Sequence, residues 1–240
     1  MKQQRRIKNV GILGALEKEI AHIRTQLSHV HENNAGTVII GDYYGIQVVA
    51  TVSGMGTINA ASAAQVLISE HKVDAIIMCG IAGNLNYSLG VGDIVIAKLA
   101  TLMDSDNAII AESAPHLTEF ASDVTLMQYA KTAAEHYAKN VVCGHIVTGN
   151  KYIDSALKPA VLEKYPNADA VEMEGVAVLQ VAAKNGIPAV VIRTLSDNAN
   201  VDYDELSADV FSLTKYAEVS SKIALEVVRI INEELIVSNE

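Results

Sequence analysis

The sequence predicts an α/β protein, a three-layer α/β/α sandwich around a central mixed, mostly parallel sheet. Three short runs of apolar and β-branched residues, 10–15, 73–80 and 189–192, are typical of buried strands. Segments with apolar residues at helical spacing alternate with such runs, a pattern that places helices on both faces of a sheet. The chain has 240 residues, 50% of them hydrophobic, and is long enough to bury one large core.

Domain organisation is simple. Only four prolines occur and no Ser/Gly-rich linker is present, so we expect a flexible leader over residues 1–8 and a single domain over 9–236. The start MKQQRRIK resembles the first part of a signal peptide, but the apolar stretch behind it is short and soon meets Glu17 and Glu19. No apolar run reaches the ~18 residues of a membrane helix.

The remaining elements follow in order. Expected strands are 37–40 and 48–52, paired around the turn GDYYG, then 91–100, 140–150 and 171–175. Expected helices follow the first strand and the strand at 171–175, and cover the later part of 53–71, then 123–139, 155–164 and 207–234. The polar stretch 101–120 is expected to be a long functional loop.

Composition excludes several classes of function. The net charge of −10 argues against a nucleic-acid partner, and with only five arginines the chain favours a neutral or cationic small ligand. No GxGxxG, P-loop, HExxH or GxSxG motif occurs, so we expect neither cofactor nor metal. Cys79 and Cys143 lack CxxC spacing, which favours a reduced, cytoplasmic location. The mean hydropathy of +0.23 is high for a soluble monomer, and it suggests a two-fold subunit interface.

Acidic residues lie at the ends of three of the expected strands. Glu17 and Glu19 come after the strand at 10–15, and Glu172 and Glu174 stand in the VEMEG strand. Ser196 and Asp197 close the run VIRTLSD, which also holds Arg193. Ligands of open α/β sheets bind beyond the carboxyl ends of strands. If these strands are parallel, their acids lie on one rim.

Each of these residues also has a structural interpretation. Asp197 is either a general acid with a raised pKa or a turn residue in SDNAN. Glu19 either activates a water or is a solvated first-turn acid that complements the helix dipole, a role that Glu17 fills equally well. Arg193 is either functional or paired with Glu172 or Glu174, because an unpaired buried charge is costly.

The two acids of VEMEG are similarly ambiguous. In an extended segment Glu172 and Glu174 share a face, where they can accept hydrogen bonds from the vicinal hydroxyls of a sugar. The alternative is a capping role for the helix that begins near Gly175. The intervening Met173 is equally compatible with the core.

Seven motifs together resemble a known family. GILGALEKEI, VSGMGTINAA, CGIAGNL, VGDIVIA, VTGNKYI, AVEMEG and VIRTLSD stand in the order seen in the nucleoside phosphorylase/hydrolase superfamily, and are similar to its 5′-methylthioadenosine/S-adenosylhomocysteine nucleosidases. The resemblance runs from about residue 10 to residue 231. It implies a three-layer sandwich, a homodimer, no metal and a purine nucleoside as substrate, and the Glu of GALEKEI favours the hydrolases over the phosphorylases.

The resemblance also implies roles for individual residues. Glu19 resembles the acid that activates the attacking water, Arg193 would help place that water, and Asp197 resembles the acid that protonates N7 of adenine. The substrate-binding positions are Glu174 with Glu172 and Met173 at the ribose, Met55 on the sugar side, Tyr152 stacking on adenine, Ile153 reading its edge, and Ser196 and Ile81 nearby.

The sequence departs from the family in two places. Ile81 stands where a hydroxyl residue is usual and Asn84 where glycine is usual, which removes a hydrogen bond expected near the water or Asp197. Thr101, Leu102 and Met103 replace an Arg, an aromatic residue and a His, and 107–120 replaces a Gly-rich stretch that walls the 5′-substituent pocket, partly across the dimer.

We therefore expect hydrolysis of the N-ribosidic bond of a 5′-thio-substituted adenosine. A phosphorylase is the first alternative and would require phosphate. A nucleoside-binding protein with weak catalysis is the second, suggested by Ile81 and the divergent 101–106 segment. A flavodoxin-like redox carrier is disfavoured because Trp is absent, aromatic residues are scarce and the strand ends are acidic.

Overall fold

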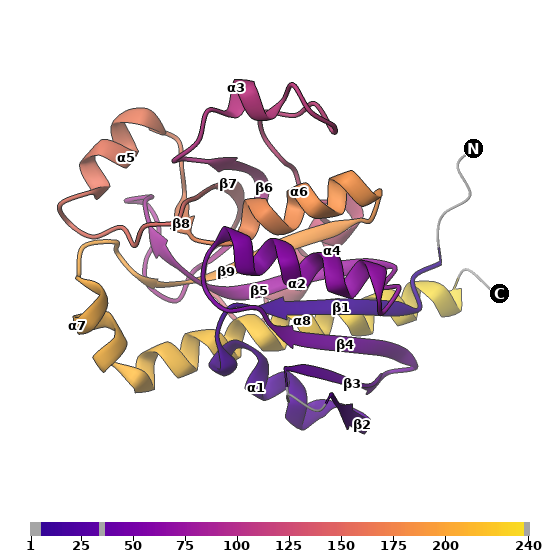
Figure 1. Cartoon of the computed structure of the whole chain (residues 1–240). Helices are drawn as coiled ribbons and strands as arrows, with labels where there is room; N and C mark the ends of the chain where they lie inside the picture. Colours follow the sequence, from indigo (N-terminus) through magenta and orange to yellow (C-terminus); the bar gives the residue numbers. More distant parts are fainter. Residues whose placement is uncertain (1–5, 34–36, 238–240) are drawn as a thin grey trace.

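The structure is a computed structural model that describes residues 6–33 and 37–237 (Figure 1). Residues 1–5 of the expected leader lie outside the described residues. The strands are β1 (Asn9–Gly14), β2 (Ser28–Glu32), β3 (Val38–Tyr43), β4 (Ile46–Val52), β5 (Ala75–Asn84), β6 (Ile94–Leu102), β7 (Val141–Thr148), β8 (Ala170–Glu172) and β9 (Ala189–Asp197). The helices are α1 (Glu17–Gln26), α2 (Thr57–Ser69), α3 (Asn107–Ile110), α4 (Val124–Ala134), α5 (Lys158–Lys164), α6 (Gly175–Asn185), α7 (Tyr203–Ala208) and α8 (Val210–Val237).

The described strands form one mixed sheet in the order β2-β3-β4-β1-β5-β8-β7-β6-β9. Five strand pairs are parallel and four are antiparallel, so the prediction of a mixed, mostly parallel sheet is confirmed. β9 pairs with β5 as well as with β6. The strands β5, β8, β7, β6 and β9 therefore close into a ring, which hydrophobic periodicity gives no means to predict because it does not name pairing partners.

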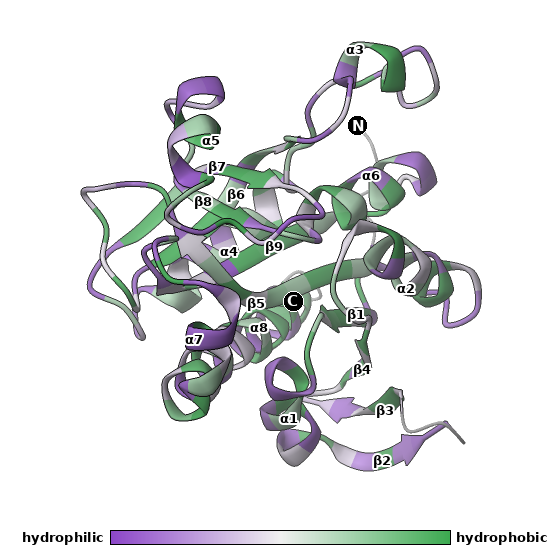
Figure 2. Ribbon diagram, turned by 60° about the vertical axis from the view of Figure 1, so that its left-hand side comes forward, coloured by the Kyte–Doolittle hydropathy of each residue, from purple (hydrophilic) through white to green (hydrophobic). Residues whose placement is uncertain are grey.

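Helices cover both faces of the sheet, as expected for three layers. α1, α4 and α8 pack together on one face, and α2 and α6 pack together on the other. Each face has its own large cluster of buried apolar residues. Figure 2 shows the hydrophobic colour concentrated on the central strands, with hydrophilic colour on outer segments such as β2 and α7.

Local chemistry explains several element boundaries. The β3–β4 hairpin turns at Tyr44 and Gly45, whose φ values of 47° and 75° suit a tight turn with left-handed residues. Asp123 caps α4 by accepting the N–H groups of Thr125 and Leu126. Gly186 ends α6 with φ 64°.

Two expectations about elements were wrong, and one strand was not predicted. The helix predicted over 207–234 is two helices, because α7 ends at Ala208 and α8 begins at Val210. β2 was not predicted, since all its residues are exposed and it carries no buried apolar pattern. The expected loop 101–120 is shorter, because Thr101 and Leu102 complete β6, residues 107–110 form α3, and Phe120 bridges back to Ala100.

Candidate active site

A cavity of about 100 Å³ lies where β1, β5, β8 and β9 end. Ten of the eleven predicted site residues line it: Glu19, Met55, Ile81, Tyr152, Ile153, Glu172, Met173, Glu174, Ser196 and Asp197. The eleventh, Arg193, is fully buried and lies behind the cavity wall against the two VEMEG acids. Three acids remote in sequence, Glu19, Glu174 and Asp197, thus meet at one site.

Glu19 points inward from the first turn of α1 and is only 1% exposed. Its Oε2 accepts the N–H groups of Ala15 and Leu16 at 2.7 and 2.9 Å, and its Oε1 accepts the N–H of Ile81 at 2.9 Å. Burial raises the pKa of Glu19, opposed first by the nearby Arg193 and then by these N–H groups. Glu17, by contrast, is exposed and pairs with Arg24.

Gly80 on β5 marks the point where Glu19 and Arg193 converge. A Cβ atom built on Gly80 would collide with Nη1 of Arg193 and Oε1 of Glu19. The absence of a side chain at this position is therefore what allows the carboxylate and the guanidinium to lie side by side over β5.

Both carboxylate oxygens of Glu172 are hydrogen-bonded within the protein. Its Oε2 accepts the N–H groups of Glu174 and Gly175 at 2.9 and 2.7 Å, at the start of α6, and also receives Nη2 of Arg193. Its Oε1 accepts the hydroxyl of Thr148. Glu172 thus caps α6 and neutralises Arg193, the two structural interpretations that its position in the sequence allowed.

The carboxylate of Glu174 accepts fewer hydrogen bonds from the protein than that of Glu172. Its Oε1 accepts the N–H of Gly56 at 2.7 Å, and its Oε2 lies 3.3 Å from Nη2 of Arg193. Burial raises the pKa of Glu174 to about 7, with Arg193 acting in the opposite sense and Glu172 adding to the increase. Gly56 supplies this contact from a backbone with φ 94°, at the entrance to α2.

Asp197 closes β9 and is 8% exposed. Its Oδ1 accepts the N–H of Ala199 at 2.6 Å and its Oδ2 accepts the hydroxyl of Ser196 at 2.8 Å. Burial raises the pKa of Asp197, while these two donors and Lys158 lower it. Ser196, the preceding residue of β9, is thus a side-chain donor to this carboxylate.

The opposite wall of the cavity is aromatic and apolar. The rings of Tyr152 and Tyr203 meet edge to face at 5.4 Å. The Tyr203 hydroxyl lies 3.9 Å from the sulfur of Met55. The hydroxyl of Tyr152 is buried and has no hydrogen-bond partner. A purine ring and a thioether fit such a wall, because flat apolar surface recognises them by contact.

Sequence reasoning missed part of the lining. Leu16, Lys151, Tyr203 and Leu206 also face the cavity. Tyr203 and Leu206 belong to α7, whose start was marked by Asp202, an N-cap that accepts the N–H of Glu205. That capping signal marks a helix that begins at Tyr203, before the start of the helix predicted over 207–234.

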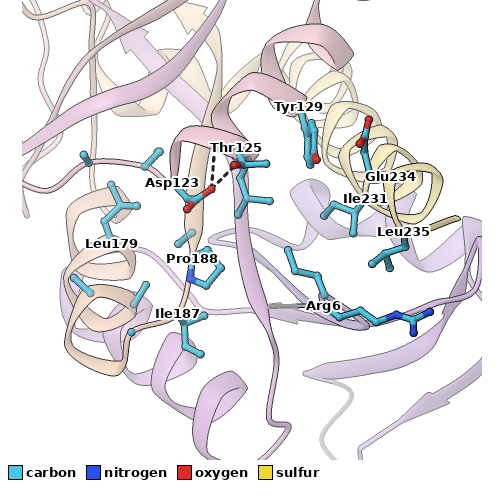
Figure 3. A pocket seen from close by; sticks show the side chains of 18 residues that line it. Arg6, Asp123, Thr125, Tyr129, Leu179, Ile187, Pro188, Ile231, Glu234 and Leu235 are labelled. Atoms are coloured by element: carbon cyan, nitrogen blue, oxygen red, sulfur yellow. Dashed lines mark hydrogen bonds between the residues drawn. The ribbon is translucent and has the colours of Figure 1, made fainter. Parts of the chain in front are cut away.

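A second, larger groove of about 810 Å³ lies at the other end of β9 (Figure 3). Arg6, Asp123, Pro188 and Glu234 are among its lining residues, and it contains none of the predicted site residues. Asp123 is already engaged in capping α4. Of these two pockets, the smaller cavity is the one lined by buried acids whose pKa is raised. We therefore assign the active site to the smaller cavity.

No group of three or more His, Cys, Asp or Glu side chains in residues 6–33 and 37–237 is arranged to hold a metal ion. None of the helices in these ranges is long and apolar enough to cross a bilayer.

Comparison with known proteins agrees with this geometry. A family model described as "Phosphorylase superfamily" matches residues 9–229. The 5′-methylthioadenosine/S-adenosylhomocysteine nucleosidase of Shewanella halifaxensis is 36% identical over 212 residues, covering 82% of this chain and 90% of that protein.

Solved structures give the same result. The 5′-methylthioadenosine/S-adenosylhomocysteine nucleosidase from Neisseria meningitidis, in complex with methylthio-immucillin-A, superimposes with a TM-score of 0.85. The two chains are 32% identical, and the match covers 93% of this chain and 99% of that one. Futalosine hydrolase of Helicobacter pylori superimposes with a TM-score of 0.80 at 25% identity, covering 93% and 98%. The chain belongs to the phosphorylase superfamily and, within it, to the 5′-methylthioadenosine/S-adenosylhomocysteine nucleosidase family.

Proposed function

We propose that this protein hydrolyses the N-ribosidic bond of 5′-methylthioadenosine, S-adenosylhomocysteine or a related 5′-substituted adenosine, and releases adenine. The observation that carries the proposal is the meeting of Glu19, Glu174 and Asp197, all buried, around one cavity with an aromatic wall. Membership of the nucleosidase family supports the same reaction.

Asp197 is assigned the general acid. Cleaving the bond leaves electrons on the purine, and protonation of N7 makes adenine a better leaving group. Burial raises the pKa of Asp197, so the carboxyl holds a proton at higher pH than a solvated aspartate would. Ile153 is assigned to recognition of the edge of the base, and Tyr152 to stacking on its face.

Glu19 is assigned the general base for the attacking water. Arg193 and three backbone N–H groups stabilise its ionised form against the effect of burial. Glu174 is assigned the ribose hydroxyls, with Met173 and Met55 against the sugar. The carboxylates also stabilise the positive charge that develops on the ribose ring.

The same charges favour water over phosphate as the nucleophile. A phosphorylase needs cations at the anion subsite, but Arg193 is already held by Glu172 and Glu174. The acidic lining repels a phosphate dianion.

The test is adenine release by the purified protein from 5′-methylthioadenosine and S-adenosylhomocysteine in phosphate-free buffer. We expect adenine and the free thioribose. A strict requirement for phosphate, with a sugar 1-phosphate as product, would identify a phosphorylase. Tight binding of the nucleoside in calorimetry without any cleavage would identify a binding protein.

We also propose that the protein is a cytoplasmic homodimer. Ile58 on α2 and Ile109 on α3 are 84% and 63% exposed, and Leu117 is 43% exposed, which is apolar surface that a second subunit would bury. Light scattering on the purified protein should give twice the chain mass. Cell fractionation tests the location.

A further inference from the structure

Two adjacent serines on α8, Ser220 and Ser221, are fully buried against the sheet. α8 packs against α1, β5 and β9, the elements that carry Glu19, Ile81 and Arg193. The neighbouring buried positions of the helix include Ala217 and Ala224, so methyl groups suffice for packing on this face. A buried hydroxyl costs free energy unless it is hydrogen-bonded, and both of these are.

Ser221 contacts the main chain of the proposed general base. Its Oγ donates to the carbonyl oxygen of Glu19 at 2.5 Å and lies 3.0 Å from that of Ala217 in its own helix. The thiol of Cys79, on β5, donates to the same Glu19 oxygen at 3.7 Å. The start of α1 is thus tied to α8 and to β5 through one carbonyl group.

Ser220 contacts the two strands beside it. Its Oγ accepts the N–H of Gly80 at 2.7 Å and lies 3.4 Å from the carbonyl oxygen of Ile192, to which it can donate. Gly80 is the residue over which the Glu19 carboxylate and the Arg193 guanidinium meet, and Ile192 immediately precedes Arg193. The pairing of β1 with β5 ends at Met78, while β9 pairs with β5 as far as Gly83, so Ser220 contacts Gly80 where β5 has lost one of its two neighbouring strands.

We propose that Ser220 and Ser221 are positioning residues for the hydrolytic step. Their hydroxyls fix the main chains of Glu19, Gly80 and Ile192 relative to one another. The Glu19 carboxylate, the Ile81 N–H that binds it and the Arg193 guanidinium then keep one geometry. The inference rests on the proposed function, because it takes Glu19 as the base that activates water.

The experiment compares Ser220→Ala and Ser221→Ala with the matched control Thr214→Ala. Thr214 lies on the exposed side of α8 and bonds the carbonyl oxygen of Val210 at 2.7 Å, as Ser221 does with Ala217. Adenine release from 5′-methylthioadenosine gives kcat and KM, calorimetry gives the affinity for adenine, and urea unfolding reports stability.

We expect kcat of both serine variants to fall about tenfold to a hundredfold, since small displacements of reacting groups have effects of this size. KM and adenine affinity should change little, because the hydrogen bonds of these serines do not go to the proposed base-binding residues Tyr152, Ile153 and Asp197. The control should match the unaltered enzyme. Ser221→Cys, which keeps a weak donor, should recover part of the rate if Ser221→Ala folds poorly.

The pH profile separates positioning from simple destabilisation. In Ser220→Ala the Ile81 N–H should bind the Glu19 carboxylate less well, so the pKa of Glu19 rises and the acidic limb of kcat/KM moves to higher pH. The other groups that face Glu19 are Arg193, Glu174 and Cys79, which are unchanged.

Unchanged kcat and pH profile in both variants would overturn the inference. So would a loss of rate that only follows the loss of folded protein, with the acidic limb in place. If the unaltered protein releases no adenine at all, the proposed function itself fails, and that result is distinct from both of these.

Discussion

Gly80 shows how much a single residue decides in this site. A methyl group there would overlap the guanidinium of Arg193 and the carboxylate of Glu19, which are both buried and cannot move into solvent. We expect Gly80→Ala to destabilise the fold by about 1–3 kcal/mol through overpacking. It should also lower the rate of adenine release by about a hundredfold.

The matched control for this prediction is Gly90→Ala. A Cβ at Gly90 would meet only Asp93, at 3.8 Å, which is ordinary contact. Both variants are compared by urea unfolding and by initial rates. Equal stability and equal rates in the two variants would show that the close approach of Arg193 and Glu19 to Gly80 does not affect folding or activity.

Asp197 is the residue that we expect to protonate the leaving purine. Asp197→Asn keeps the size of the side chain and an oxygen for the Ala199 N–H, but its amide has no acidic proton to transfer to N7. We expect turnover to fall by about 10²–10⁴-fold, the usual contribution of a general acid, with the protein still folded. Asp123→Asn, at the far end of β9, keeps its N-cap and should turn over normally. A similar rate in both would exclude Asp197 as the acid.

Sequence predicted which residues gather at the cavity, but it did not predict the environment of each side chain. The strand ends and the family motifs placed ten residues that now line one cavity. Sequence spacing could not decide whether Glu17 or Glu19 is the site residue. The packing of α1 against the sheet buries Glu19 and leaves Glu17 exposed. Likewise, the sequence did not distinguish the roles of Glu172 and Glu174. In the structure, hydrogen bonds from Thr148 and from the start of α6 give Glu172 a structural role.

At the scale of elements, the junction of β8 and α6 depends on one buried ion group. Arg193 of β9 binds Glu172 at the end of β8, and Glu172 also receives two N–H groups at the start of α6. Glu172→Ala should therefore cost about 3–5 kcal/mol, because it leaves the buried guanidinium with Glu174 as its one remaining ion-pair partner.

Glu17→Ala is the control for this element-scale prediction. Glu17 forms an ion pair with Arg24 in which the side chains are 61% and 37% exposed. Removing such a surface pair should cost less than about 1 kcal/mol. Chemical unfolding at pH 7 measures both variants, and comparable costs would mean that the Glu172–Arg193 group does not hold β8, α6 and β9 together.

Element boundaries were predictable where a local signal existed. The hairpin at Tyr44 and Gly45 and the buried strands followed from turn residues and apolar runs. β2 did not, since it is a fully exposed edge strand that pairs with β3 and carries no buried apolar pattern. The closure of β9 onto β5 depends on long-range packing, for which no single segment holds a signal.

At the scale of the whole molecule, the buried acids link stability to pH. Burial raises the pKa of Glu174 to about 7, above the 4.5 of an unperturbed glutamate. Between these pH values the unfolded chain loses the proton while the folded protein keeps it. The free energy of unfolding therefore falls as pH rises through this window, by about 1.4 kcal/mol per unit and roughly 3 kcal/mol in all from this one group.

Replacing Glu174 with Gln should remove that slope, because the amide is neutral at every pH. We expect Glu174→Gln and the unaltered protein to unfold at similar urea concentrations near pH 4.5, and the variant to be the more stable above pH 7. Glu19 and Asp197, whose pKa values burial also raises, keep a residual slope of the same sign in the variant. Protein concentration is held constant, since a dimer would add its own concentration dependence. A stability difference that is the same at pH 5 and pH 8 would mean that Glu174 ionises in the folded protein as it does in water, and that its burial at the site does not disfavour its charge.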